Sequence, residues 1–257
     1  MIETIKRKKI GYFSPIEFEE GVFVINHVEG CSHGCKYPCY AQLIKRKDYE
    51  TWCKPKLIEN TLELLDKEIP KYKDKIKRVH LCFSTDPFMY NQPEVTEMTL
   101  EIIRKLFLSE IPYKTLTKGF MPCEELMNFE EINRKYKCLY RENHYGISLV
   151  SLNEDFRLEY EPFAAPYEHR IIALEYLSEH NCYTYVYMEP FSPEITSFEE
   201  FKIMLDKISF VKKIYFGSWQ YNKRYSNKTE FQKYIEYITR FCGERSIELK
   251  IKKEVKI

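Results

Sequence analysis

Three cysteines lie close together in the stretch EGCSHGCKYPCYA. Cys31, Cys35 and Cys39 are each separated by three residues, and Gly30 and Gly34 leave the backbone between them free to turn. Thiolates are soft ligands that suit zinc or iron–sulfur chemistry. The residue types and their spacing therefore predict a metal site on this loop.

Two kinds of metal site fit this cysteine loop, residues 30–41. A structural zinc site needs four ligands, and His33 or His27 could supply the fourth. An iron–sulfur cluster is normally held by four cysteines, so three would leave one iron open to a substrate or cofactor. His33 lies between two of the cysteines, where a short loop would struggle to turn it onto the same ion. The cluster is the better interpretation, and zinc is the alternative.

The composition of the 257-residue chain sets wider limits. The chain is 44% hydrophobic, so it can bury a sizeable core, and we expect a single domain over residues 1–257. Lys and Arg number 40 against 39 Asp and Glu, which argues against a general attraction to nucleic acid or membrane. Neither a signal peptide nor an apolar run of about eighteen residues occurs. We expect a cytoplasmic protein with reduced thiols and no membrane association.

The cysteine loop must be held by the surrounding elements, and short β-rich runs alternate with helical patterns along the chain. Strands are expected at residues 21–26, 78–84, 113–117, 145–150, 182–188, 212–217 and 246–252. Helices are expected at residues 93–107, 166–180, 197–208 and 229–243. Such alternation predicts an α/β fold, namely a partial (β/α)6 TIM-type barrel with parallel strands. Chemistry in such barrels occurs at the carboxyl ends of the strands, and the cysteine loop follows the first of them.

Local signals mark the ends of three of these helices. Ser197 and Glu200 form a capping box at the start of the segment 197–208. Pro166 suits the first turn of a helix, and Gly243 is typical of the residue that follows one.

The cysteine loop resembles the signature loop of radical S-adenosylmethionine enzymes, and more closely that of the branch related to spore photoproduct lyases. INHVEGCSHGCKYPCYA is similar to the pattern Asn-x3-Gly-Cys-x-His-x-Cys-x-Tyr-Cys-Tyr-Ala. Four later segments of this chain also resemble sequence elements of that branch, in the same order. They are FSTDPFMYNQPE, TLTKG, GISLVSLNEDF and EPFAAPYEHRIIAL. The resemblance covers roughly residues 20 to 195.

One residue departs from the pattern. Pro38 gives the spacing C-x3-C-x3-C, where the branch has C-x3-C-x2-C. One extra residue displaces the third thiol by about 3.8 Å along the chain. A bulge beside Gly34 is expected to absorb this displacement, which keeps Cys39 as a ligand.

The resemblance implies a [4Fe–4S] cluster on Cys31, Cys35 and Cys39, and bound S-adenosyl-L-methionine. The cluster would cleave this cofactor to methionine and a 5′-deoxyadenosyl radical, which abstracts hydrogen from a substrate. An external electron donor of the flavodoxin or ferredoxin type would reduce the cluster. Tyr37 or Tyr40 would flank the adenine. The residues implied to contact the amino-acid and ribose groups are Ser84, Asp86, Lys118 and Ser148.

Among these residues, Lys118 has the clearest chemistry, because its ammonium can meet the methionine carboxylate. Glu161 and Arg170 could form a structural ion pair or contact a ligand. Glu189 could bind substrate or simply end the fifth strand. Three other polar residues are expected to be solvated, namely His144, His169 and His180.

Cys82 is the candidate catalytic residue. Alternation along residues 78–84 turns Val79, Leu81 and Phe83 toward the helices, so Cys82 and Ser84 would share the inner face of the barrel. In spore photoproduct lyases a cysteine two residues before the corresponding serine returns a hydrogen atom to the product radical. CFSTD resembles that arrangement. The alternative is that Cys82 is a small buried packing residue.

These observations predict a radical S-adenosylmethionine enzyme of the lyase or transferase type. Its substrate is unidentified. The resemblance makes a nucleic acid or nucleotide one candidate, and a small or peptide substrate is equally compatible with the near-neutral net charge. The rival class is a non-enzymatic zinc-binding adaptor that holds nucleic acid through the basic runs at residues 5–9, 71–78 and 250–257.

Overall fold

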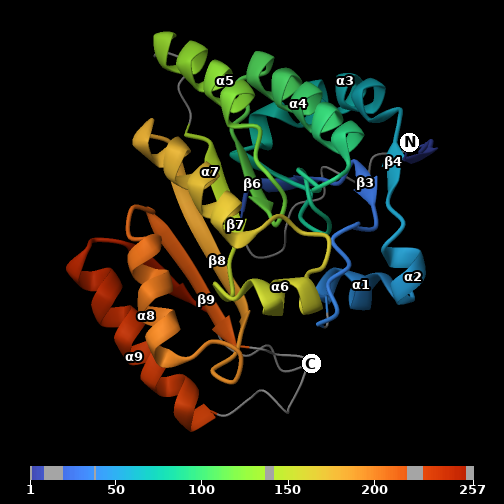
Figure 1. The fold of residues 1–257 in the computed structure, drawn as a ribbon. Coiled ribbons are helices and arrows are strands. Elements are labelled where there is room, and N and C mark those ends of the chain that lie inside the picture. The colour runs from blue at the N-terminus through green and yellow to red at the C-terminus, as the bar shows by residue number, and fades with distance from the viewer. Residues whose placement is uncertain (1, 9–19, 38, 137–141, 219–227, 253–257) are drawn as a thin grey trace.

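A seven-stranded parallel sheet forms the centre of the protein (Figure 1). The computed structural model describes residues 2–8, 20–37, 39–136, 142–218 and 228–252. The strands, in spatial order, are β10 (Glu248–Ile251), β9 (Lys213–Ser218), β8 (Tyr183–Phe191), β7 (His144–Ser148), β6 (Tyr113–Thr117), β5 (Arg78–Leu81) and β2 (Val22–Ile25). Each lies in or overlaps one of the seven expected runs, which confirms the α/β prediction.

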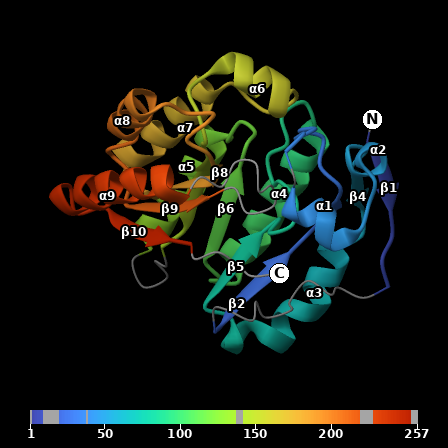
Figure 2. The same ribbon diagram turned by 90° about the horizontal axis from the view of Figure 1, so that it is seen from below.

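The helices lie along the outer side of this curved sheet (Figure 2). They are α3 (Thr61–Tyr72), α4 (Pro93–Leu108), α5 (Cys123–Lys135), α7 (Tyr167–Glu179), α8 (Phe198–Lys207) and α9 (Lys228–Glu244). The short helix α6 (Glu154–Tyr160) instead packs against the cysteine loop, where Phe156 and Tyr160 form a small apolar cluster with Tyr37. Within the described residues the two edge strands, β2 and β10, are not paired with each other. The sheet therefore has the strand order of a partial barrel that has not closed.

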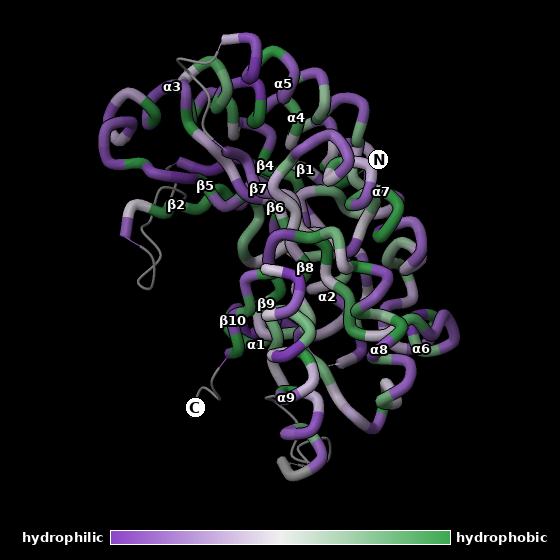
Figure 3. Tube along the Cα trace, turned by 90° about the vertical axis from the view of Figure 1, so that its left-hand side faces the viewer, coloured by the Kyte–Doolittle hydropathy of each residue, from purple (hydrophilic) through white to green (hydrophobic). Residues whose placement is uncertain are grey.

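The core lies between the sheet and the helices because each helix has one apolar side. In α4 the expected stripe is buried, with Val95, Ile102 and Leu106 fully enclosed. Figure 3 shows hydrophobic and hydrophilic stretches alternating along the outer helices, as an amphipathic helix requires. No helix in the described ranges is long and apolar enough to cross a membrane.

The helix-end predictions have mixed outcomes. Ser197 accepts a hydrogen bond from the backbone N–H of Glu200 at 3.2 Å, which confirms its capping role. Pro166 is the residue before α7 rather than part of its first turn. The prediction for Gly243 was wrong, because α9 continues to Glu244 and the left-handed residue after it is Ser246, with φ 55°.

The strand alternation beyond Leu81 was also predicted incorrectly. β5 ends at Leu81, and Cys82 has φ 52°, so the backbone turns there. The N–H of Thr85 donates to the carbonyl of Cys82 at 3.1 Å. Phe83 is 42% exposed, and its ring contacts that of His80 at 5.2 Å instead of packing under the helices.

A second, small sheet was not expected from the sequence. It consists of β1 (Glu3–Ile5), β4 (Lys56–Ile58) and β3 (Val28–Glu29), in the order β1-β4-β3. The cysteine loop begins where β3 ends, and it continues into α1 (Tyr40–Lys45) and α2 (Tyr49–Trp52). This sheet therefore anchors the start of the loop. Elsewhere in the chain, a short 3₁₀ helix, Lys73–Lys75, follows α3.

Candidate active site

The cysteine loop is tied to neighbouring elements on both sides. The N–H of Cys31 donates to the carbonyl of Trp52 at 2.9 Å, and the N–H of Lys36 donates to that of Tyr160 at 2.9 Å. Gly30, with φ 81°, has no room for a side chain, because a Cβ atom would lie 2.6 Å from the Trp52 carbonyl oxygen. Cys39 is the N-cap residue of α1. Pro38 lies outside the described residues.

The three thiols are near enough to influence one another. Burial is the main cause that raises the pKa of Cys35 to about 12, and a charge on Cys39 is one of the smaller contributions in the same direction. Burial also raises the pKa of Cys31 well above its usual value, with additional contributions from Asp86 and the other two thiols. Three thiolates would therefore gather here only with a cation to neutralise them.

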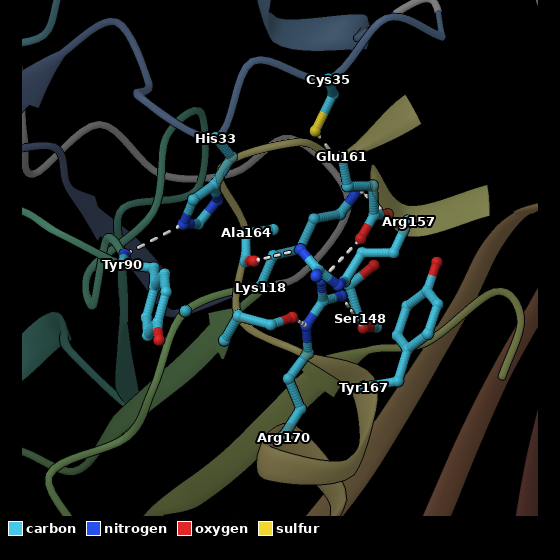
Figure 4. A network of polar contacts seen from close by, with 12 residues as sticks. His33, Cys35, Tyr90, Lys118, Ser148, Arg157, Glu161, Ala164, Tyr167 and Arg170 are labelled. Carbon is cyan, nitrogen blue, oxygen red and sulfur yellow. Dashed lines mark hydrogen bonds and ion pairs between the residues drawn. The ribbon is translucent and has the colours of Figure 1, made fainter. Parts of the chain in front are cut away.

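Lys118 reaches this loop from the end of β6. Its Nζ lies 2.8 Å from Oε1 of Glu161 and 3.7 Å from Sγ of Cys35 (Figure 4). It also lies 4.3 Å from the ring centroid of Tyr37, whose hydroxyl donates to Oε1 of Glu161. These contacts bring together three of the predicted site residues, Tyr37, Cys35 and Lys118.

Glu161 also holds a buried arginine. Nη2 of Arg170 lies 2.7 Å from Oε2 of Glu161, and both side chains are fully buried. Arg170 also donates to the backbone carbonyls of Ala165 at 2.8 Å and Ser148 at 2.9 Å. Burial by itself would raise the pKa of Glu161, but Lys118 and Arg170 outweigh it and lower that pKa to about 2. The carboxylate therefore stays charged and links the cysteine loop, β6 and α7.

Asp86 organises the residues behind this network. Its carboxylate accepts hydrogen bonds from the Thr117 hydroxyl at 2.6 Å and from the N–H groups of Phe88 and Lys118 at 2.9 and 2.8 Å. It also lies 3.5 Å from Nδ1 of His33. Asp86 is buried, and these contacts fix the loop that carries Lys118.

Two further residues predicted from the sequence, Ser84 and Tyr40, contact neighbours outside the Glu161 network. Ser84 donates its N–H and its hydroxyl to Oδ1 of Asn26, both at 3.1 Å. Tyr40 is 37% exposed, its hydroxyl contacts the Phe83 carbonyl, and the two rings lie edge to face at 6.0 Å. By contrast, Tyr37 is buried.

Cys82 is buried in a different set of contacts. Its Sγ lies 3.4 Å from Nδ1 of His27, and Nε2 of His27 lies 2.9 Å from the Thr99 hydroxyl. Val28 and Met89 belong to the same apolar cluster, and Cys31 packs against it. Sequence reasoning did not find the partnership with His27, which depends on β5 lying beside β2.

The two histidines considered as a fourth zinc ligand both have other partners. His33 accepts the N–H of Tyr90 at Nε2, at 3.2 Å, and faces Asp86 with Nδ1. His27 is engaged by Cys82 and Thr99. In the described part of the chain no three His, Cys, Asp or Glu side chains, the three cysteines included, are arranged around a single metal ion. As a fourth zinc ligand, either histidine would have to leave the contacts described here.

The inner face of the sheet, away from the helices, combines tyrosines with lysines. Nζ of Lys114 lies 4.6 Å from the ring centroid of Tyr185 and 3.2 Å from the hydroxyl of Tyr215. Lys252 lies 4.7 Å from the ring centroid of Tyr187, and it pairs with Glu189 at 2.8 Å.

Among the histidines expected to be solvated, His144 is an exception. It stacks on Tyr183 at 3.8 Å, and burial lowers its pKa to about 3. His169 is exposed, as expected, whereas His180 is half-buried and its Nδ1 lies 2.7 Å from the Tyr176 carbonyl oxygen.

The part of the chain that contains this site matches a known protein family. Residues 25–208 match the family model for the radical SAM superfamily, and this span includes the three cysteines and Lys118. The chain belongs to the radical SAM superfamily. It is also 23% identical to the uncharacterized protein MJ0683 of Methanocaldococcus jannaschii, over 97% of this chain and 96% of that protein.

Solved structures with the same fold include spore photoproduct lyases. A spore photoproduct lyase complexed with dinucleoside spore photoproduct matches this radical SAM chain with a TM-score of 0.68 and 12% identity, over 96% of this chain and 80% of that one. A mutant of that lyase with bound AdoMet and the same dinucleoside gives a TM-score of 0.64 and 11% identity, over 97% and 81% of the two chains. At such low identity the similarity establishes the fold alone.

Proposed function

We propose that this chain is a radical SAM enzyme that binds a [4Fe–4S] cluster through Cys31, Cys35 and Cys39. The observation that carries the proposal is that three half-buried cysteines lie on one loop, with the Lys118 ammonium beside Cys35, in a chain of this superfamily. The donor set suits the cluster, because each cysteine would bind a different iron and leave one iron for the cofactor. When bound, the cluster supplies the electron that cleaves S-adenosylmethionine to a hydrogen-abstracting 5′-deoxyadenosyl radical.

Lys118 is the residue we assign to the methionine carboxylate of the cofactor. Glu161 positions it by holding the ammonium at 2.8 Å beside the cysteine loop. An ammonium that is already desolvated and oriented binds a carboxylate with little further ordering cost. Ser84 and Ser148 are assigned to the ribose and amino-acid groups, and Asp86 acts by fixing the backbone of Lys118.

Tyr40 is the better candidate to flank the adenine. It is partly exposed and its ring lies against Phe83, at the end of the turn that follows β5. Tyr37 is buried and its hydroxyl is engaged by Glu161. The structure therefore supports assigning the adenine contact to Tyr40, while Tyr37 supports the cluster loop from behind.

Cys82 is proposed to return a hydrogen atom to the product radical. Its Sγ lies 3.4 Å from Nδ1 of His27, which would orient the S–H bond when His27 carries its proton on Nε2. A thiol that is buried keeps its proton, and burial raises the pKa of Cys82 to about 12. The S–H form is the one that can donate a hydrogen atom.

A nucleotide or nucleic acid is the substrate class that we propose. Support comes from the inner face of the sheet, where tyrosine rings alternate with ammonium groups of lysines 114, 213, 250 and 252. Aromatic rings suit bases and ammonium groups suit phosphates. The solved relatives of this fold include a lyase complexed with a dinucleoside. A UV-irradiated dinucleotide that neither binds nor stimulates cofactor cleavage would count against this class.

Anaerobic reconstitution with iron and sulfide tests the proposed cluster. The wild-type chain should turn brown, bind one cluster, and yield 5′-deoxyadenosine from S-adenosylmethionine when dithionite is added. Replacing Cys31, Cys35 or Cys39 by Ala should abolish the cluster. Cys53→Ala is the matched control, because Cys53 is a half-buried cysteine at the end of α2.

Two results would overturn the assignment. Zinc in the purified protein without brown absorption would favour the rival class, a zinc-binding adaptor for nucleic acid. A Cys39→Ala variant that keeps a full cluster would remove the third proposed ligand.

A further inference from the structure

The two short helices beside the cysteine loop form a surface of their own. α1 starts directly after Cys39, and α2 returns so that Tyr49 donates its hydroxyl to the Gly34 carbonyl at 2.7 Å. The Trp52 carbonyl at the end of α2 accepts the N–H of Cys31. Figure 1 shows α1 and α2 next to each other, and Figure 2 shows α1 near the end of β2. This surface is therefore joined directly to the proposed cluster ligands.

Exposed aliphatic side chains are part of this surface. Ile44 is 70% exposed and Leu43 is 50% exposed, while Ala41 is the buried residue of α1. Tyr49 is also 39% exposed. A helix that buries one alanine and presents two neighbouring aliphatic residues to solvent gains little from packing on its own protein. Neighbouring exposed aliphatic residues can serve as the apolar centre of a contact with another molecule.

Basic residues flank these aliphatic residues in the sequence. The exposed basic residues of this surface are Lys36, Lys45, Arg46, Lys47 and Lys54. Within the described residues none of them forms an ion pair with a carboxylate, in contrast to Lys56, which pairs with Glu3 at 2.6 Å. The nearby Asp48 caps α2 by accepting the N–H of Thr51 at 2.8 Å. The chain as a whole is nearly neutral, so this positive charge is a local property.

We propose that this α1–α2 face, defined by Leu43, Ile44, Tyr49 and the five basic residues above, docks a small acidic protein that donates single electrons to the cluster. The inference rests on the proposed function, since it needs the cluster as acceptor. Electron-transfer contacts are small and short-lived, so two short helices provide enough area. Complementary charge around an apolar centre speeds the encounter and orients the partner.

The charges alone would also suit nucleic acid, but the aliphatic residues favour a protein. Lysine and arginine contact phosphates, whereas solvent-exposed Ile44 and Leu43 offer nothing to a phosphodiester chain. A protein interface has an apolar centre with a polar rim, which is the composition of this face. The position beside Cys31 and Cys39 also suits delivery of an electron to the loop.

The experiment uses reconstituted holoenzyme with reduced flavodoxin as the probe, and dithionite as the chemical reductant. The test variants are R46E/K47E, which reverses two charges, and Ile44→Ser, which removes the apolar centre. The matched control is K207E/K212E, which reverses two exposed lysines at the end of α8 and just before β9. Cluster reduction is followed by stopped-flow absorbance and by the EPR signal of the reduced cluster, and flavodoxin binding by calorimetry.

R46E/K47E should lower the rate of flavodoxin-dependent reduction by about tenfold at low salt, with the difference fading at high salt. Ile44→Ser should weaken flavodoxin binding severalfold with little salt dependence. Reduction by dithionite should be unchanged in all variants, and the control should match the wild type throughout.

Three outcomes would overturn the inference in distinguishable ways. Unchanged flavodoxin-dependent rates in both test variants would reject this docking face while leaving the proposed function intact. If R46E/K47E no longer binds a single-stranded oligonucleotide but still binds flavodoxin, the face would be assigned to nucleic acid. A wild-type protein that dithionite cannot reduce would reject the proposed function, and the docking inference with it.

Discussion

Sγ of Cys82 lies 3.4 Å from Nδ1 of His27, and both side chains are buried. The Thr99 hydroxyl lies 2.6 Å from the Pro87 carbonyl oxygen and 2.9 Å from that of Val95, so it can donate to a carbonyl and accept from Nε2 of His27 at 2.9 Å. In the tautomer that carries its proton on Nε2, His27 would accept the Cys82 thiol at Nδ1. That tautomer would fix the direction of the thiol proton.

The first prediction concerns this pair. His27→Ala should lower the free energy of unfolding by about 3 kcal/mol and Cys82→Ala by about 1 kcal/mol, because a buried cavity and lost hydrogen bonds are involved. The double variant should cost about 1 kcal/mol less than the sum, since the two residues are partners. Urea unfolding of the three variants measures this coupling, and strictly additive values would contradict the contact.

Cys82→Ala should also separate catalysis from cofactor cleavage. The variant is expected to keep its cluster and to form 5′-deoxyadenosine with dithionite, because Cys82 is not a proposed ligand. With substrate present it should stall or release a different product. If it gives the normal product at the normal rate, Cys82 is only a packing residue.

Stability should fall as the pH is lowered from neutrality. Burial lowers the pKa of His27 to about 4, and of His80 and His144 to about 3. In the unfolded chain these groups titrate near pH 6.5, so between about pH 6.5 and 3 the unfolded state binds more protons. Their contribution is fully present above this window and is lost as the pH falls through it. Urea unfolding across the window should show the decline, and His27→Gln should make it shallower.

Glu161 should be the most sensitive position in the polar network. Glu161→Gln keeps the shape of the side chain but leaves Arg170 buried without a counter-charge, which should cost about 3 to 5 kcal/mol. Lys118→Met should destabilise the fold less, because the pair of Glu161 with Arg170 remains. It should nevertheless weaken S-adenosylmethionine binding by about tenfold or more, measured by calorimetry on the reconstituted enzyme. Unchanged cofactor affinity in Lys118→Met would reject the carboxylate assignment.

The loop after β6 should tolerate no side chain at Gly119. A Cβ atom there would lie 1.5 Å from the Phe88 carbonyl oxygen, so the backbone would have to move. Gly119→Ala should destabilise the protein by about 3 kcal/mol and disturb Lys118 next to it. Gly243→Ala is the control, because no atom lies within 4 Å of its would-be Cβ and it lies inside α9. That variant should be neutral or stabilising by up to about 1 kcal/mol.

The sequence by itself determined the elements that carry strong local signals. Seven β-rich runs became seven parallel strands, and the stripe through Val95 and Ile102 became the buried side of α4. Hydrophobic periodicity predicts such segments because each must hide one face, whatever its neighbours are. The cysteine spacing likewise indicated a metal loop, since the ligand types are adjacent in the chain.

Only the tertiary structure decided which distant residues meet. Glu161 lies 124 residues from Tyr37 and 43 from Lys118, yet it contacts both, because β6 and the end of α6 come together at the cysteine loop. The turn at Cys82 ended the alternation that would have buried Phe83, and two- and three-residue strands such as β3 are too short to show any period. Local pattern specifies which face of an element is apolar, whereas contacts across the fold depend on how the whole chain packs.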